Sequence, residues 1–113
     1  MIYIASPYSH PSAEVRAERY RAARAYTWLL LGEAQACFSP VVYGHQFALT
    51  YAAPQDHDFW KRINITMLCQ ASAMHVLALD GWRESFGIQH ERMVAEALEL
   101  PITIITGERL ARI

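Results

Sequence analysis

The apolar run Ala73-Met-His-Val-Leu-Ala-Leu79 leads into the turn Asp80-Gly-Trp-Arg-Glu-Ser-Phe-Gly87, and this turn leads into Ile88-Gln-His-Glu-Arg-Met-Val-Ala-Glu-Ala-Leu98. A continuous apolar run of this kind is typical of a parallel strand that is buried on both faces. The segment after the turn has apolar residues at helical spacing, which predicts a helix over residues 87–99. Strand, turn and helix together predict an α/β fold. Ligands of such folds bind beyond the carboxyl ends of the strands, where this turn lies.

The rest of the chain repeats this order of elements. Further strands are predicted at residues 1–5, 36–39 and 100–105, and further helices at 13–31, from 56 or 58 to 70, and at 107–112. Residues 41–54 predict either a short helix over 44–49 or an irregular lid. Ser12 is the expected N-cap of the first helix, and Gly32 is its expected C′ residue. We therefore predict one domain over residues 1–113, a flavodoxin-like or Rossmann-like three-layer sandwich with a four- to five-stranded parallel sheet.

The length of 113 residues fits one globular domain, and the formal net charge is −1. This charge balance gives no support for binding polymeric nucleic acid or an acidic membrane surface. Arg16, Arg19, Arg21 and Arg24 share one predicted helix, where a solvated face is favoured over a local basic patch. The N-terminus lacks the pattern of a signal peptide, and no apolar run approaches the roughly 20 residues of a membrane span. We therefore expect a soluble, cytoplasmic protein.

The histidines and cysteines do not have the spacing of a metal site. The five histidines form no HxH or HExxH pattern, and the two cysteines, Cys37 and Cys69, form no CxxC pair. We expect both cysteines to be free, buried thiols. His75 lies inside an apolar strand, which favours a hydrogen-bonded core histidine. The chain has no P-loop and no GxSxG motif. We therefore expect neither a metal nor a cofactor.

Glu91 is the unusual residue of the predicted helix over 87–99. It falls on the stripe Ile88, Glu91, Ala95 and Leu98, which faces the core and normally excludes carboxylates. The helix dipole favours its ionised form, while burial favours its neutral form. A desolvated carboxylate of this kind acts as a nucleophile at an electrophilic carbon or as a general base. The alternative is a glutamate that only supports the helix dipole, and the pattern by itself leaves both open.

The turn before Glu91 carries three further candidates. Ser85 and Gly87 supply a hydroxyl and unobstructed backbone amides at a helix start, which is phosphate-binding chemistry as well as ordinary capping chemistry. Asp80 follows the strand, where it either accepts hydrogen bonds from sugar hydroxyls or forms a turn with Gly81. Aromatic residues at positions 43–60 favour core packing over a wall for stacking a base.

Two blocks of sequence resemble the nucleoside 2-deoxyribosyltransferase-like superfamily. They are Met-Ile-Tyr3-Ile-Ala-Ser6-Pro and Asp80-Gly-Trp-x-x-Ser85-x-Gly87-x-x-x-Glu91-x-x-x-Ala95. Within that superfamily the chain is most similar to a short bacterial and phage branch. The superfamily includes transferases that exchange the base of deoxyribonucleosides, and hydrolases that split nucleoside 5′-monophosphates into base and sugar phosphate. The resemblance therefore implies cleavage or transfer at an N-glycosidic bond.

The resemblance also implies roles for individual residues. Glu91 matches the nucleophile that attacks the anomeric carbon, and Tyr3 matches a tyrosine that touches this carboxylate. Asp80 lies near the position of an aspartate that binds the sugar. Ser85 matches a serine that binds the 5′-phosphate, and Ser6 and Gly87 join it as expected substrate-binding residues. The acid near the leaving base usually comes from the helix before the third strand, where this chain offers Asp58 and Asn64.

The predicted function is N-glycosidic bond cleavage or base transfer on a (deoxy)nucleoside 5′-monophosphate through a carboxylate nucleophile. The predicted partner is a small nucleotide or nucleoside, and members of the superfamily favour a homodimer or a larger homo-oligomer. Two alternatives belong to other classes of protein: a non-catalytic nucleotide-binding sensor module, and a small interaction protein that uses the fold only.

Overall fold

A parallel sheet of four strands lies at the centre of the part of the chain that the structure describes, residues 1–53 and 57–111. In this computed structural model the strands are β1 (Ile2–Ala5), β2 (Cys37–Phe38), β3 (Ala73–Leu77) and β4 (Ile102–Ile105). Their order across the sheet is β2-β1-β3-β4. The connections contain α1 (Ala13–Gly32), α2 (Pro40–Tyr51), α3 (His57–Leu68), the 3-10 turn η1 (Trp82–Glu84) and α4 (Phe86–Ala97), and α5 (Gly107–Ala111) follows β4. The predicted parallel α/β fold is confirmed.

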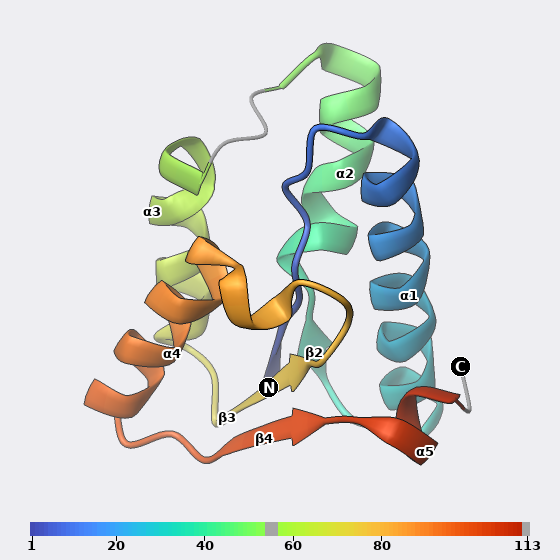
Figure 1. Cartoon of the computed structure of the whole chain (residues 1–113). Helices are drawn as coiled ribbons and strands as arrows, with labels where there is room; N and C mark the ends of the chain where they lie inside the picture. Colours follow the sequence, from blue (N-terminus) through green and yellow to red (C-terminus); the bar gives the residue numbers. More distant parts are fainter. Residues whose placement is uncertain (54–56, 112–113) are drawn as a thin grey trace.

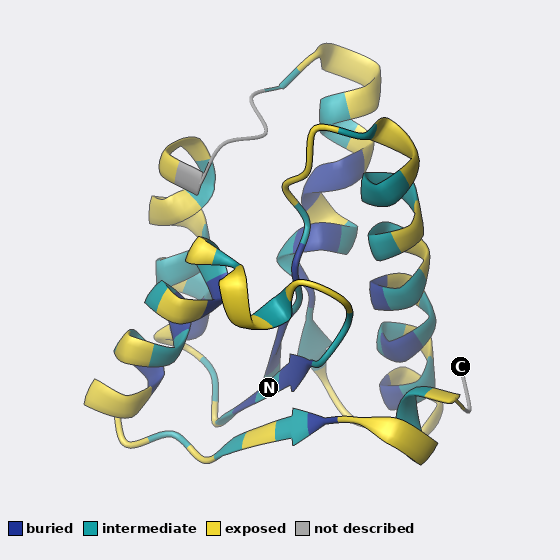
Figure 2. Cartoon of the chain, in the orientation of Figure 1, coloured by how far each residue is buried: buried dark blue, intermediate teal, exposed yellow. Residues whose placement is uncertain are grey.

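Helices cover both faces of the sheet, so the domain has three layers (Figure 1). The core on the side of α1 and α2 consists of Ile4, Ala23, Tyr26, Leu30, Val41, Leu77 and Ile105. The core on the side of α3 and α4 consists of Tyr3, Ala5, Leu68, Met74, Val76, Ile88 and Ala95. Figure 2 shows the buried residues on the strands and on the inward sides of the helices. The radius of gyration, 13.0 Å, fits one compact domain, for which about 13 Å is expected at 100 residues.

The alternation of side chains along β1 decides which layer each residue serves. Tyr3 and Ala5 belong to the core under α3 and α4, whereas Ile4 belongs to the core under α1. In the pairing of β1 with β3, Tyr3 lies opposite Met74, and Met74 belongs to the same core cluster as Tyr3. The period of the strand therefore directs the Tyr3 side chain into the layer of α4.

The C-terminus of α1 differs from the sequence expectation. Gly32 is still helical, and the left-handed C′ residue is Ala34, with a φ of 59°. The N–H of Gln35 donates to the carbonyl of Leu30 (2.9 Å), and the N–H of Ala34 donates to the carbonyl of Leu31 (3.0 Å), which is the bonding of a Schellman motif. The prediction for Gly32 was therefore wrong, because these hydrogen bonds end the helix two residues later. At the other end, Ser12 is the N-cap as predicted and accepts a hydrogen bond from the N–H of Val15 (3.3 Å).

The helix α2 is longer than the short helix expected over 44–49, and no irregular lid occupies Pro40–Tyr51. Ser39 caps it by accepting a hydrogen bond from the N–H of Val42 (3.1 Å), and Pro40 occupies the first turn, where no N–H is needed. The strand β3 ends at Leu77, not at residue 79, because the Leu79 carbonyl accepts a hydrogen bond from Trp82 in a turn (3.0 Å).

Two other expectations were wrong about burial. Leu98 is 43% exposed and follows the last residue of α4, so only the other three residues of its predicted stripe are buried. Both cysteines are free as expected, but Cys69 is exposed. Of the two candidate caps for α3, residue 56 lies outside the described residues and Asp58 lies in the first turn of the helix.

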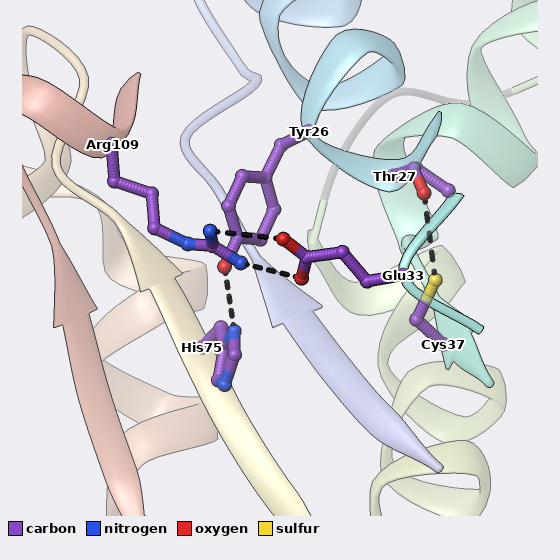
Figure 3. A network of polar contacts seen from close by, with 6 residues as sticks. All are labelled: Tyr26, Thr27, Glu33, Cys37, His75 and Arg109. Carbon is purple, nitrogen blue, oxygen red and sulfur yellow. Dashed lines mark hydrogen bonds and ion pairs between the residues drawn. The ribbon is translucent and has the colours of Figure 1, made fainter. Parts of the chain in front are cut away.

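A network of polar contacts joins α5 to the end of α1 (Figure 3). The Arg109 guanidinium forms two hydrogen bonds to the Glu33 carboxylate (2.9 and 3.2 Å). Beside them, the Tyr26 hydroxyl and His75 Nδ1 are 2.8 Å apart. His75 is therefore hydrogen-bonded inside the fold, as its place in an apolar strand predicted. The ion pair is partly exposed, and such pairs contribute about 0–1 kcal/mol.

A membrane span would need a longer and more apolar helix than any found in residues 1–53 and 57–111.

The end of α1 yields a first prediction. A Cβ at Gly32 would meet nothing within 4 Å, so Gly32→Ala removes backbone entropy from the unfolded chain and should stabilise the protein by about 0.5–1 kcal/mol. Ala34→Gly should also stabilise it, by about 1 kcal/mol, because the left-handed conformation strains alanine. Urea unfolding measures both. If Gly32 were the left-handed residue, Gly32→Ala would instead be destabilising.

Candidate functional site

A cleft of about 560 Å³ opens where β1 and β3 end. The chain leaves β1 toward β2 on one side and β3 toward β4 on the other, so this edge is the topological switch point of the sheet. Ligand sites are usually about 300–1,000 Å³ in volume. The residues around the cleft come from the loop after β1, from α1 to α3, from the turn between β3 and α4, and from α4 itself: Ser6, Tyr8, Ser9, His10, Arg19, Pro40, Val41, Gly44, Ala48, Trp60, Asn64, Gly81, Glu84, Ser85, Phe86, Gly87, Ile88 and Glu91.

Glu91 and Tyr3 form a buried pair beside this cleft. Glu91 lines the cleft although only 6% of its surface is exposed, and Tyr3 behind it is fully buried. The Tyr3 hydroxyl donates a hydrogen bond to Oε2 of Glu91. The two residues are 88 positions apart in the chain, and the alternation of β1 and the helical stripe of α4 bring them together. The carboxylate therefore has a protein partner on one side and the cleft on the other.

Burial controls the protonation of this pair. Desolvation raises the pKa of Glu91 to about 7, although the hydrogen bond from Tyr3 acts in the opposite direction. Burial and the neighbouring carboxylate raise the pKa of Tyr3, so this hydroxyl keeps its proton. Near neutral pH the site therefore contains a carboxylate that is partly ionised and a tyrosine that donates to it. Strongly shifted groups of this kind in a cleft are typical of functional sites.

The start of α4 contributes backbone donors to the cleft. Ser85 is the N-cap, and its hydroxyl oxygen accepts a hydrogen bond from the N–H of Ile88 (3.3 Å). The hydroxyl hydrogen of Ser85 stays available to a ligand, because the cap uses only its oxygen. Gly87 is in the first turn of the helix, whose amides have no intrahelical partner. This end of the cleft therefore suits an anion.

Arg19 ties together the two loops that border the cleft. Its guanidinium donates to the carbonyls of Ser9 (3.0 Å), Tyr8 (3.4 Å) and Asp80 (3.0 Å). Gly81 makes this contact possible, because its φ is 87° and a Cβ there would lie 2.7 Å from Arg19 Nη2. Arg19 therefore brings a positive charge to the cleft while it holds the loop after β1 against the loop after β3.

The favoured interpretation of the arginines as a solvated face was wrong for two of the four. Arg16, like Arg19, turns back onto the loop after β1, where it donates to the carbonyls of His10 and Pro11, the latter at 3.2 Å. Arg21 and Arg24 are exposed. Both inward arginines follow a loop whose carbonyls lack regular partners, and these carbonyls attract them.

The structure brings together several of the predicted site residues but not all of them. Those that line the cleft are Ser6, Asn64, Ser85, Gly87 and Glu91. The hydroxyl oxygen of Ser6 is buried and makes no hydrogen bond to any described residue, which leaves it for a ligand. Asp80 and Asp58 are exposed and are not among the lining residues. Asp80 instead borders a separate hollow formed by residues 78–84.

Sequence reasoning missed other residues of the cleft. Tyr8 lines it, and its hydroxyl lies 2.6 Å from Nδ1 of His45, a buried residue of α2. Trp60 lines it as well, with its indole against Gly44, where a Cβ would be only 3.4 Å from the ring. Of the aromatic residues at positions 43–60, only Trp60 lines the cleft. Three others, Tyr43, Tyr51 and Phe59, are exposed, so core packing was wrong for them.

Trp82, next to Gly81, has a packing role. It packs against the core cluster under α3 and α4, and the guanidinium carbons of Arg83 and Arg92 lie 5.0 and 5.9 Å from its ring centroid. The contact of Arg92, a residue of α4, joins η1 to α4, whereas Arg83 belongs to η1 itself. Among the described residues, no group of three or more His, Cys, Asp or Glu side chains is arranged to hold a metal ion.

Comparison with known proteins identifies the family. The model of the family described as "Domain of unknown function (DUF1937)" matches residues 1–107, and the chain belongs to this family. No curated protein matches the chain.

The buried carboxyl of Glu91 predicts a pH-dependent stability. Because its pKa is about 7 in the folded protein and 4.5 in its ordinary state, the neutral form stabilises the fold at low pH. This contribution is lost as the pH rises through 7. Glu91→Gln should therefore match the wild type in free energy of unfolding at pH 4.5 and exceed it at pH 8.5 by up to about 3 kcal/mol. Glu96→Gln, an exposed change on the same helix, is the control and should show no such difference. Equal pH profiles of the Glu91→Gln variant and the wild type would contradict the burial of an ionisable carboxyl.

Proposed function

We propose that the protein cleaves or transfers the N-glycosidic bond of a (deoxy)nucleoside 5′-monophosphate, with Glu91 as the nucleophile. The observation that carries this proposal is the pair of Glu91 and Tyr3, a buried carboxylate that faces a cleft and is hydrogen-bonded from behind. A carboxylate that served only the helix dipole would need neither burial nor a buried partner. The resemblance to the nucleoside 2-deoxyribosyltransferase-like superfamily supports the same assignment.

The charge around the cleft supports a phosphorylated substrate. Arg19, the Ser85 hydroxyl and the first turn of α4 at Gly87 all border the cleft at the exit of β3. A phosphate monoester would receive a cation, a hydroxyl donor and backbone amides there. Ser6, whose hydroxyl has no hydrogen-bond partner among the described residues, supplies a further polar contact from the loop after β1. A neutral nucleoside would leave this set of donors without an anion to bind.

The other wall of the cleft supports a flat aromatic ligand. Trp60 borders the cleft, and its indole packs against the backbone of α2 at Gly44. Asn64, one turn along α3 from Trp60, borders the same wall and carries both a donor and an acceptor. An indole surface with an amide beside it fits a nucleobase, which offers a flat ring and polar edges.

The proposed mechanism follows from these positions. Glu91 attacks the anomeric carbon as the carbon–nitrogen bond to the base breaks, and its charge stabilises the oxocarbenium-like transition state, as in retaining glycosidases. Tyr3 fixes the orientation of the carboxylate and keeps part of it ionised against the effect of burial. Water then releases the sugar phosphate, or a second base takes its place.

The first test is release of free base. The wild type, incubated with a panel of ribonucleoside and deoxyribonucleoside 5′-monophosphates, should release base from at least one of them, as followed by chromatography. Glu91→Ala and Glu91→Gln should lower this rate on the order of 1,000-fold or more, because both remove the nucleophile. Glu96→Gln, exposed on the same helix, should have wild-type activity.

Two other outcomes would decide against the proposal. If no nucleotide loses its base but nucleotides raise the melting temperature of the wild type, the protein is a non-catalytic nucleotide-binding module and not an enzyme. Base release that is the same for the wild type and both Glu91 variants would mean that the activity does not come from this cleft.

The pair also predicts how the rate depends on pH. The reaction requires ionised Glu91, so kcat/KM should rise with pH through about 7. Tyr3→Phe removes the hydrogen bond that lowers the pKa of Glu91, so the rising limb should move to higher pH. The activity lost in Tyr3→Phe should therefore be greater at pH 6 than at pH 8. A loss that is the same at every pH would show that Tyr3 acts in some other way.

A further inference from the structure

Tyr8 and His45 form a second polar pair at the cleft, and the attack by Glu91 on the anomeric carbon does not involve it. Tyr8 follows β1 and lines the cleft, and its hydroxyl lies 2.6 Å from Nδ1 of His45. His45 is on α2 and is only 8% exposed. Tyr8 packs against the core on the side of α1 and α2, whereas Glu91 belongs to α4 in the opposite layer. The two pairs therefore approach the cleft from opposite layers of the fold.

The surroundings of the pair hold both rings in place. The rings of His45 and Tyr20 stack with their centroids 4.1 Å apart and their planes 19° apart. The rings of Tyr8 and His45 meet edge-on, with centroids 5.5 Å apart. Burial, followed by the positive charge of Arg16, lowers the pKa of His45, so its imidazole is neutral at neutral pH. Burial raises the pKa of Tyr8, while Arg16 acts in the opposite direction by favouring the tyrosinate.

N-glycosidic cleavage needs a proton donor, because a nucleobase is a poor leaving group as an anion. Besides Glu91, which is the proposed nucleophile, three side chains of the cleft have an acidic hydrogen on a phenol, an imidazole or a carboxyl group: Tyr8, His10 and Glu84. His10 and Glu84 are exposed, and His10 Nδ1 accepts a hydrogen bond from the N–H of Ser12 (3.0 Å). Tyr8 is partly buried and held by a buried partner, as a general acid needs.

We propose that Tyr8 gives the proton to the departing base and that His45 is its positioning residue. This inference rests on the proposed function of Glu91. It assigns the neutral Nδ1–H tautomer to His45, so His45 donates to the Tyr8 oxygen and the Tyr8 hydrogen is directed to the ligand. The opposite layers of the fold then divide the reaction: α4 supplies the nucleophile, and the loop after β1, supported by α2, supplies the acid.

One oxygen of Glu91 bonds to the anomeric carbon while the carbon–nitrogen bond breaks and its electron pair goes to the base. The Tyr8 hydroxyl protonates the base, which leaves as a neutral molecule, and the tyrosinate is stabilised by His45 Nδ1–H and the charge of Arg16. Water then attacks the anomeric carbon, the bond to Glu91 breaks to restore the carboxylate, and one proton of the water returns to Tyr8.

The test compares two substrates that differ only in the leaving group. One is the nucleotide that the wild type cleaves best, and the other is the same sugar 5-phosphate with 4-nitrophenolate, which departs as a stable anion. Tyr8→Phe should lower kcat for the nucleotide about 100-fold, with little change in KM, and leave kcat for the nitrophenyl substrate within about threefold of wild type. Glu91→Ala should lose both reactions. Tyr43→Phe, the same chemical change at an exposed site on α2, is the control and should lose neither.

His45→Phe tests the positioning role. It should lower kcat for the nucleotide roughly tenfold and leave the nitrophenyl reaction unchanged, because the acid remains but is held less well. In the Tyr8→Phe background, His45→Phe should cause no further loss, as expected for two residues that act as a unit. A further loss there would assign His45 to another task. Near-native circular dichroism should accompany every variant.

The outcomes separate this inference from the proposed function. Wild type that releases neither base nor nitrophenolate contradicts the proposed function and this inference together. Wild type that cleaves both substrates, with Tyr8→Phe losing both equally or neither, contradicts only the role of Tyr8. Loss confined to the nucleotide supports it.

Discussion

The buried hydrogen bond from Tyr3 to Glu91 is the contact on which the rest of the site depends. A carboxylate inside a fold is costly unless a partner satisfies it, and Tyr3 is the partner that the central strand supplies. This contact requires β1 to lie in the middle of the sheet and α4 to dock on the face where Tyr3 points. The contact between Tyr3 and Glu91 therefore links the arrangement of the layers to the chemistry of the cleft. The raised pKa of Glu91 follows from the same burial.

The cleft lies at the switch point between β1 and β3, next to Glu91. Both loops leave the sheet at the same edge, and Arg19 holds them together through three backbone carbonyls. Gly81 provides the close approach, since a side chain there would collide with Arg19. The same arginine places a positive charge at the cleft, which the first turn of α4 also lines. One residue thus holds two loops together and brings charge to the cleft, so the cleft can be rigid and charged at once.

Fold alone does not determine activity, because parallel α/β domains carry many unrelated functions. The chain belongs to the family described as a domain of unknown function, so the proposed N-glycosidic chemistry rests on the site. The proposed reaction uses Glu91 in one layer, Tyr8 with the buried His45 in the other, and the start of α4, which suits an anion. Glu91, Tyr8 and Ser85 each have a different local environment, and the proposed reaction gives each of them a different task.

The sequence by itself determined the parallel α/β fold and the anomaly of Glu91, because strand and helix periodicity are local properties of the chain. It left Ser85 open between capping and phosphate binding, and the structure shows that Ser85 caps α4. Only the tertiary structure decided that Tyr8 meets His45, 37 residues away, and that Arg19 turns inward. Local patterns cannot predict such contacts. The sequence of a loop or of a helical arginine is the same whether the side chain points into solvent or contacts another segment of the chain. The end of α1 was missed for a related reason, because several hydrogen bonds to one turn outweighed the preference of a single glycine.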